Sequence, residues 1–361
     1  MWFAKNSDRH PAEAQVLEWH PRRAGSATTE TQYLTVPGAE AGAFLGSRPT
    51  WLWGCEHGVN EHGVMIGNEK IFTVDSPRRL PPALLGMDIV RLVLERARTV
   101  DDALDLCTSL VETHGQGGSG EPFDDEPYFS SFLLADARAA WVVETSNRTW
   151  VAKPAGDGTS ISNRVSLTTD WSRASPDVMP GTDFDERRLP QVPTNRADHR
   201  LAVTRACVAR GPVVDARDLA ATLRDHTDAN GSGFSVCLHR ADFDAQTTAS
   251  MIVDVRSDGG STRVWSCLGN PCVGVYVPMF PPAAVPELVD ENQWHRFARL
   301  RDRVEADRAE AERVRAVLAP VEQELWTNAD EVYGTGRAGA IEAFVANAYA
   351  PVDAALDRLG V

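Results

Sequence analysis

The chain has 361 residues, of which 43% are hydrophobic and 24% are charged, and its net charge is −15. These values are typical of a soluble globular protein with room for one large domain or two moderate ones. The acidic balance argues against nucleic acid or an anionic membrane surface as a partner, because both attract clustered positive charge.

Targeting signals and cysteine chemistry give equally plain expectations. No apolar run approaches the roughly 20 residues that a membrane-spanning helix needs, and the first residues lack the pattern of a secretory signal. We therefore expect a cytoplasmic protein. The six cysteines show no CxxC spacing, so we expect buried free thiols, with a disulfide or a metal as the less favoured alternatives. They are Cys55, Cys107, Cys207, Cys237, Cys267 and Cys272. No metal and no other cofactor is expected.

Hydrophobic periodicity predicts short strands interrupted by helices, in an order without regular βαβ alternation. Strands are predicted at 32–36, 64–66, 132–135, 140–144, 149–153, 160–167, 234–238, 248–255, 263–268 and 273–277. Helices are predicted at 87–97, 99–114, 215–225, 292–318 and 339–359, the last two lying across the outside of a sheet. Residues 170–198 are expected to form a long surface loop. This order favours an α+β layered sandwich over a doubly wound sheet.

The helix at 99–114 has the clearest local boundaries. Thr99, with Asp102 three residues later, is a predicted N-cap, and Gly115 is a predicted helix end.

The first segment that suggests chemistry is residues 5–9, Lys-Asn-Ser-Asp-Arg, directly after an apolar stretch. Lys5 and Asp8 approach a common site if the strand bends after Asn6. A nearby cation lowers the pKa of a thiol, and a carboxylate positions an amine by hydrogen bonding. The alternative is a solvated strand end with a local ion pair.

The second segment, residues 51–69, is unusually rich in Gly, Asn, Glu and His. Its glycines allow close backbone approach, and its side chains supply amide donors and carboxylates. Cys55, His57 and His62 raise the question of a metal site, but the His spacing is not that of a helical HExxH pair. A thiol–imidazole pair of Cys55 with His57 is also the minor alternative, because catalytic pairs usually come from separate elements.

Two later segments carry weaker signals. Asn163, beside a predicted strand, offers an NH2 group that would stabilise an oxyanion, whereas the alternative is an ordinary turn residue. The run at 246–251 either lines a polar cleft or packs on a sheet edge. His239 is expected to be structural rather than a catalytic base.

In this order the segments resemble the secernin and dipeptidase A branch of the N-terminal nucleophile (Ntn) hydrolases. The motifs are Lys-Asn-Ser-Asp-Arg at 5–9, Trp-x-Trp-Gly-x-Glu-x-Gly-x-Asn-Glu-His-Gly-Val-x-Ile-Gly-Asn-Glu at 51–69, Ile-Ser-Asn-Arg at 161–164, Cys-x-His at 237–239 and Gln-Thr-Thr-x-Ser-Met at 246–251. The resemblance runs from Trp2 to about Phe280. The motif at 51–69 is long and specific, and the others gain weight from their order.

The resemblance implies an α+β fold of the αββα type, two antiparallel sheets stacked face to face with helices on both outer faces. We accordingly expect a core at residues 1–285, lacking its first strand, and a helical extension at 286–361. The implied activity is that of a cysteine-type amidohydrolase acting on dipeptides or related small amides. A terminal Cys thiolate attacks the carbonyl, its α-amino group carries the proton, and water resolves the acyl-enzyme.

The resemblance also implies roles for individual residues. Asp8 would position the nucleophile, with Lys5 where related bile-salt and penicillin amidases place an arginine. Asn68 and Asn163 would donate to the oxyanion, each contributing ~3 kcal/mol. The residues expected to bind substrate are Asn6, Arg9, Glu56, Asn60, Glu61 and Arg164. The expected partner is a small peptide or amide, and the C-terminal helices offer a face for a homodimer.

The chain departs from the family pattern at its start. Family members carry a Cys one short hairpin upstream of the 5–9 motif, whereas this chain begins Met1-Trp2. One hypothesis is a start further upstream, because loss of a strand from a buried sheet would expose an edge and apolar surface. The other is a catalytically silent relative that serves as a binding or scaffold protein.

Overall fold

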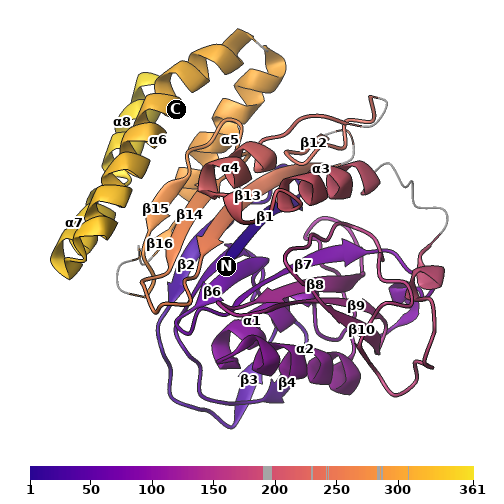
Figure 1. The fold of residues 1–361 in the computed structure, drawn as a ribbon. Helices are drawn as coiled ribbons and strands as arrows, with labels where there is room; N and C mark the ends of the chain where they lie inside the picture. Colours follow the sequence, from indigo (N-terminus) through magenta and orange to yellow (C-terminus); the bar gives the residue numbers. More distant parts are fainter. Residues whose placement is uncertain are drawn as a thin grey trace.

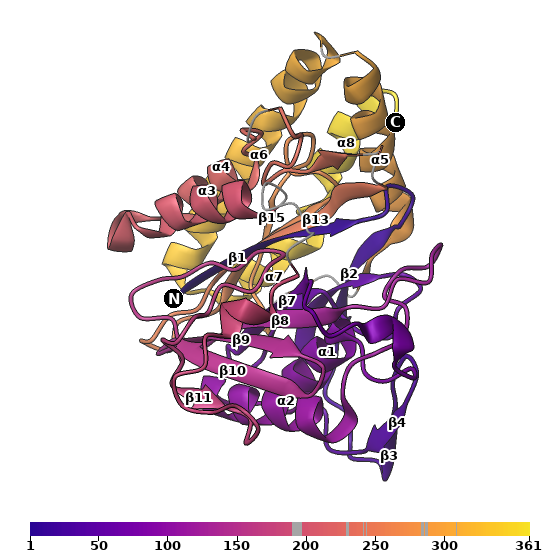
Figure 2. The ribbon, with the colours of Figure 1, turned by 90° about the vertical axis from the view of Figure 1, so that its right-hand side faces the viewer.

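Two antiparallel sheets lie face to face, and helices cover the outer face of each (Figures 1 and 2). The computed structural model describes residues 1–189, 197–228, 231–240, 242, 244–282, 285, 288–307 and 309–361. The predicted α+β, four-layer αββα sandwich is confirmed.

The first sheet has the strand order β1-β13-β14-β15, with β12 also paired to β13, and every pairing is antiparallel. Its strands are β1 (Trp2–Arg9), β12 (His239–Arg240), β13 (Ala245–Asp254), β14 (Arg263–Leu268) and β15 (Val277–Met279). The N-terminal strand therefore pairs with a strand that lies more than 200 residues later in the sequence.

The second sheet has the order β11-β10-β9-β8-β7-β6-β5-β2-β16. Its strands are β2 (Gln15–His20), β5 (Phe44–Pro49), β6 (His57–Asn60), β7 (Met65–Ile71), β8 (Phe129–Ala135), β9 (Ala140–Ser146), β10 (Thr149–Pro154), β11 (Arg173–Ala174) and β16 (Leu288–Val289). A separate small ribbon pairs β3 (Thr28–Glu30) with β4 (Thr35–Pro37).

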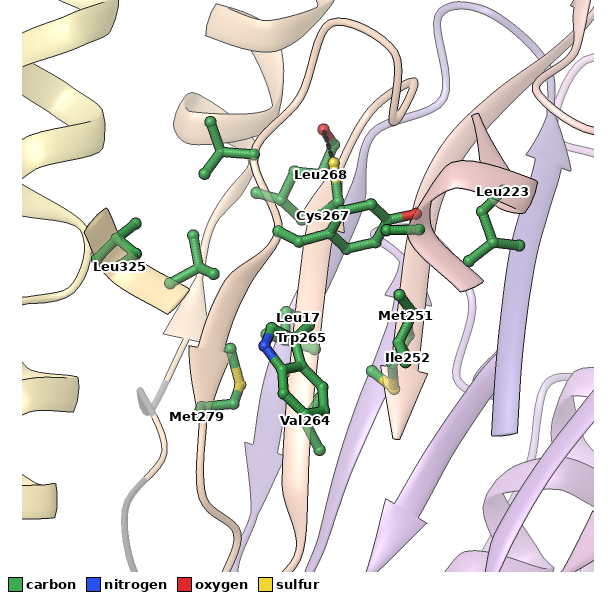
Figure 3. Close-up of a cluster of buried hydrophobic side chains, with 14 of the residues drawn as sticks. Leu17, Leu223, Met251, Ile252, Val264, Trp265, Cys267, Leu268, Met279 and Leu325 are labelled. Atoms are coloured by element: carbon green, nitrogen blue, oxygen red, sulfur yellow. Dashed lines mark hydrogen bonds between the residues drawn. The ribbon is translucent and has the colours of Figure 1, made fainter. Parts of the chain in front are cut away.

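Helices α1 (Gly86–Arg96) and α2 (Val100–His114) pack on the second sheet. The first sheet is covered by α3 (Asp198–Val208), α4 (Ala216–Leu223), α5 (Glu291–Ala306), α6 (Ala309–Thr335), α7 (Ala338–Asn347) and α8 (Ala350–Arg358), as Figure 1 shows. Side chains from both sheets and from this helical layer form one hydrophobic cluster, in which Leu17, Met251, Trp265 and Leu325 are buried (Figure 3). Among the described residues, no helix has the length and apolar character needed to cross a membrane.

Local signals placed several elements correctly. The Thr99 hydroxyl accepts a hydrogen bond from the Asp102 N–H at 3.1 Å, and the Asp102 carboxylate accepts one from the Thr99 N–H. Gly115 has a φ of 72° at the end of α2, a conformation that favours glycine. The predicted cap and helix end are confirmed.

The predicted strand at 160–167 is wrong. Two backbone N–H groups of this segment, those of Ser166 and Leu167, donate to the buried carboxylate of Glu144 at 2.8 to 2.9 Å. The place beside β10 is taken by β11, which divides the predicted loop at 170–198. A side chain on a neighbouring strand thus replaces the pairing that the alternating pattern suggested.

The predicted strand at 234–238 is also wrong, because its polar backbone groups have other partners. The Cys237 N–H donates to the carbonyl of Asp225, and the Leu238 N–H donates to the hydroxyl of Thr247. Strand pairing begins only at β12.

Three parts of the helical structure differ from the prediction. Helix α3 was missed, and it begins in what was expected to be a loop. The expected helix at 292–318 is two helices, with Asp307 in an extended conformation between them. The expected helix at 339–359 is likewise divided into α7 and α8.

Candidate active site

Strand β1 brings the first candidate residues to the centre of the molecule. Its side chains alternate in burial, and Lys5 is buried on the face toward the second sheet. The pairing register with β13 shifts between Ser7 and Asp8, an irregularity that re-aims side chains. Lys5 and Asp8 consequently line the same two cavities, as expected if the strand bends.

Lys5 is held by two carboxylates of the 51–69 motif. Its Nζ donates to Glu69 Oε1 at 3.2 Å and lies 4.0 Å from Glu56 Oε2. Removal from water raises the pKa of Glu69; the charge of Asp8 adds to this rise, and the charge of Lys5 opposes it. The site therefore holds an acid that is more easily protonated than an exposed glutamate.

Asp8 and Asn163 are joined by one guanidinium. Arg200 of α3 donates through Nη1 to Asp8 Oδ2 at 2.7 Å and through Nη2 to Asn163 Oδ1 at 2.5 Å. The Thr247 hydroxyl donates to the other Asp8 oxygen at 2.7 Å. Both oxygens of Asp8 are thus fixed, and its orientation is set by a helix and a strand that follow it by about 200 residues.

The amide NH2 of Asn163 is already engaged. It donates to the carbonyl of Lys70 at 3.0 Å and to Glu69 Oε2 at 3.4 Å. Stabilising an oxyanion would require Asn163 to exchange one of these bonds, so its expected role stays a prediction.

Asn68 precedes Glu69 on β7, so its side chain lies on the opposite face of that strand. It is 2% exposed, and with its amide group turned to satisfy its neighbours, its NH2 donates to Glu56 Oε2 at 3.3 Å and to the Glu56 carbonyl at 3.0 Å. It lines the second cavity only. Its expected oxyanion role likewise stays a prediction.

Two cavities meet at these side chains. The first, of about 1030 Å³, runs along β1 and is bounded by helices α3 and α4. The second, of about 530 Å³, is lined mainly by charged residues. The residues that line both are Lys5, Asp8, Glu69, Asn163 and Arg200, here called the junction residues.

Of the residues expected to bind substrate, three border a cavity. Asn6 lines the first, but its NH2 donates to the carbonyls of Leu223 and Val236 at 2.9 and 2.8 Å. Arg9 and Glu56 line the second and bond to each other at 3.1 Å. Burial lowers the pKa of Arg9, but surrounding carboxylates outweigh this and raise it well above its usual value.

The other three lie elsewhere. Asn60 closes a turn by accepting from the backbone of His62 and Val64, and it also donates to two carbonyls at the end of α1. Glu61 binds the Ala43 N–H and Arg22. Arg164 pairs with carboxylates beyond the cavities, those of Asp185 and Asp198. Neither cavity is lined by Asn60, Glu61 or Arg164, so their positions give no support for a substrate-binding role.

Cys55 and His57 are both fully buried. Burial raises the pKa of the Cys55 thiol to about 12 and lowers that of His57 well below its usual value. A thiol with so high a pKa carries almost no thiolate at neutral pH, so this pair is not an activated nucleophile.

Three residues of the site were not singled out from the sequence. Glu69 ends the 51–69 motif and was noted there only as a carboxylate. Thr247 belongs to the run that was weighed as a cleft lining. Arg200 gave no signal, because no helix or strand was predicted between residues 198 and 215.

The chain is similar to known proteins in its first half and in its layered arrangement. Residues 1–153 match the family model described as acyl-coenzyme A:6-aminopenicillanic acid acyl-transferase. Penicillin V acylase from Agrobacterium tumefaciens is 14% identical with a TM-score of 0.48, over 78% of this chain and 83% of that one. A mutant of conjugated bile acid hydrolase from Clostridium perfringens is 12% identical with a TM-score of 0.46, over 73% of this chain and 84% of that one.

The family match covers less than half of the chain, and the TM-scores are below 0.5. The family description names an acyl-transferase, and the two structures are named an acylase and a hydrolase. The narrower resemblance to secernins and dipeptidases is not confirmed by any of them.

Proposed function

We propose that this chain is an amide hydrolase of the N-terminal nucleophile type, acting on dipeptides or related small amides through an acyl-enzyme. The observation that carries the proposal is the set of junction residues. Two acids, two cations and an amide, drawn from distant parts of the sequence, line both the extended first cavity and the charged second cavity. The match to an acyl-transferase family model over residues 1–153 supports the same reaction class.

The charge of the second cavity supports a peptide with a free amino group as substrate. Its lining contains eight carboxylates, from Asp8, Glu56, Glu69, Glu121, Asp124, Asp125, Glu126 and Asp244. Against them stand five cations, from Lys5, Arg9, Lys70, Arg78 and Arg200. This excess of negative charge favours an ammonium group. The first cavity, with Trp2, Phe3 and Leu219 in its lining, suits an apolar side chain.

The proposed mechanism needs a terminal Cys in a segment that leads into β1. Its thiolate attacks the amide carbonyl, and its α-amino group takes the thiol proton and delivers it to the leaving amine. Expulsion of that amine leaves a thioester, which water hydrolyses. Asp8, fixed by Arg200 and Thr247, orients the α-amino group in this scheme. Residues 1–6 all line the first cavity, so a preceding segment that turned back along β1 as a hairpin would run beside the junction residues.

The test compares two forms of the protein on a dipeptide panel, with release of free amino acid as the measurement. One form starts at Met1, and the other starts at an in-frame upstream codon that supplies a terminal Cys. We expect hydrolysis by the longer form, and its loss when that Cys is replaced by Ala. Asp8→Asn should also abolish it, whereas the exposed Asp101→Asn should not. Absence of hydrolysis from both forms would contradict the proposal.

A second candidate function is a silent binding protein. It is favoured by the chemistry of the junction residues, which include no thiol and no hydroxyl. Calorimetry would then show dipeptide binding that depends on Asp8 and Arg200, without any turnover by either form.

A further inference from the structure

Four side chains outside the cavities point at a common centre. His226, Cys237, His239 and Cys272 each offer one ligand atom, and these four atoms lie within 4.8 Å of one another. Sequence spacing did not indicate this cluster, because its members are spread over 47 positions with no CxxC or HxxxH pattern.

The members come from three separate segments. His226 follows α4, Cys237 and His239 flank the start of β12, and Cys272 lies in the turn between β14 and β15. Cys237 lies in a bend two residues before His239, and the Cys237 Sγ is 3.5 Å from the His239 Nε2.

Two of the distances between these ligand atoms match those around a tetrahedral metal ion. Zn²⁺ binds thiolate sulfur at about 2.3 Å and imidazole nitrogen at about 2.0 Å, so a tetrahedron separates sulfur from nitrogen by about 3.5 Å. The His239 Nε2 lies 3.5 Å from the Cys237 Sγ and 3.2 Å from the Cys272 Sγ. Two sulfurs and two imidazoles form a donor set that suits zinc better than hard cations such as Mg²⁺ or Ca²⁺.

A carboxylate behind the cluster supports the same conclusion. Glu305 of α5 contacts His239 Nδ1 at 2.7 Å, which leaves Nε2 directed at the two sulfurs. A carboxylate on the distal nitrogen is the usual second partner of a zinc-bound histidine. Gln246 donates to the same Glu305 oxygen at 2.8 Å and fixes its position.

The segments are already held together before any ion binds. Arg224, near His226, donates to the carbonyl of Pro271, which precedes Cys272. Asn270 donates to the carbonyl of Leu238, between the other two ligands. The cluster is therefore preorganised by backbone contacts, as a high-affinity metal site requires.

We propose that His226, Cys237, His239 and Cys272 bind one structural Zn²⁺ ion that fixes the loop between α4 and β13. Four protein ligands complete a tetrahedron and leave no position for substrate, which distinguishes a structural from a catalytic zinc. This segment matters because Asn6 donates to the carbonyl of Leu223, at the end of α4, and to that of Val236, the residue before Cys237. Thr247, which orients Asp8, also accepts from the N–H of Leu238. The ion would therefore fix the backbone at Leu238, which bonds to Thr247, and Thr247 in turn bonds to Asp8.

Two other uses of these residues predict different outcomes. Cys272, His239 and Glu305 have the order of a nucleophile, a base and an orienting acid. However, neither cavity is lined by Cys272, and a second Cys and a second His face the same point. A Cys237–Cys272 disulfide would use the sulfurs without the two imidazoles.

The first experiment measures metal content. Protein purified with a thiol reductant and without added metal is expected to contain one zinc per chain by elemental analysis. Cys237→Ala and Cys272→Ala should lose this zinc, whereas Cys107→Ala, a buried thiol in α2 on the opposite helical layer, should keep it. Cys272→His, which replaces one ligand by another, should retain zinc and so separates loss of the ion from loss of the fold.

The second experiment examines the ligands directly. Metal-free protein titrated with Co²⁺ should develop the visible absorption of a tetrahedral site together with sulfur-to-cobalt charge-transfer bands. Glu305→Gln should weaken Zn²⁺ affinity about 10- to 100-fold in competition with a chelator. A silent Co²⁺ titration, zinc retention in both Cys→Ala variants, or an intact mass showing a disulfide would overturn the proposal. So would selective alkylation of Cys272 in native protein that lacks zinc.

Discussion

At the scale of single residues, the site depends on contacts that join distant parts of the sequence. Arg200 bonds to both Asp8 and Asn163, and it comes from a helix that no local pattern announced. The motif at residues 5–9 was identifiable because five polar residues follow an apolar strand. Its partners were not, because an arginine on a surface-like helix has no distinctive sequence signature. The sequence therefore indicated three of the five junction residues and gave no sign of Arg200, which connects two of them.

Replacing Arg200 tests whether this connection matters. In the longer, active form of the protein, Arg200→Gln should lower kcat/KM for a dipeptide by about 10²-fold, because Asp8 and Asn163 lose their common donor and shift. Arg205→Gln, an exposed arginine on the same helix that also lines the first cavity, should have little effect. Equal losses in the two variants would show that Arg200 acts only through general charge.

At the scale of elements, capping residues and hydrophobic alternation predicted helices and strands correctly where no distant side chain binds the backbone. Strand β14 has the predicted bounds, and α2 begins and ends at its predicted signals. The segment at 160–167 alternates as well as many strands do, but Glu144 binds its backbone instead. This interaction cannot be predicted from the sequence of the segment itself, because the carboxylate lies more than 20 residues earlier.

The cap of α2 gives a test of local stability. Thr99→Ala removes the acceptor for the Asp102 N–H and should lower the free energy of unfolding by about 1 kcal/mol. Thr113→Ala, at an exposed position near the other end of α2, is the matched control and should change it much less. Urea denaturation measures both, and equal values would argue against the cap.

The start of α1 gives a test of pH dependence. Burial raises the pKa of Asp88 to about 7, although its carboxylate accepts from the Leu85 N–H at 3.0 Å. A raised folded-state pKa means that the native protein binds more protons than the unfolded chain between the two pKa values. This contribution to stability is complete below about pH 4 and is lost as the pH rises through about 7, at up to ~1.4 kcal/mol per pH unit.

Asp88→Asn should remove that part of the pH dependence while keeping an acceptor for Leu85. The measurement is the free energy of unfolding of both proteins between pH 5 and pH 8. Burial raises the pKa of Glu144 to about 7 as well, so wild type and variant should share a comparable slope from that group. Parallel curves for the two proteins would contradict the assignment to Asp88.

At the scale of the whole molecule, the C-terminal helices are part of the central packing. Trp294 of α5 is 1% exposed, and its indole N–H donates to the carbonyl of Thr248 in the first sheet. Strand β16 pairs with β2 in the second sheet immediately before α5 begins. Residues 286–361 were expected to be a helical extension packed on the core at 1–285, and this division of the chain stays a prediction. Their contacts with both sheets arise from tertiary packing that a weak apolar stripe in the sequence does not reveal.

Trp294→Ala should therefore destabilise the entire protein rather than the helical end alone. We expect a loss of about 3–5 kcal/mol in the free energy of unfolding, because a large buried side chain is removed. Unfolding monitored by fluorescence and by circular dichroism should show one coincident transition. The exposed neighbour His295→Ala should behave as wild type. Two separate transitions would indicate an independent C-terminal unit.

The unequal charges around the second cavity have a kinetic consequence. With eight carboxylates against five cations at its lining, this cavity should attract a diffusing cation over distances comparable to the Debye length, about 8 Å at physiological ionic strength. Encounter with a positively charged dipeptide should therefore slow as salt is added, whereas encounter with the same dipeptide acetylated at its amino group should not. Ionic strength thus becomes a simple variable that separates attraction at the entrance from chemistry at the junction residues.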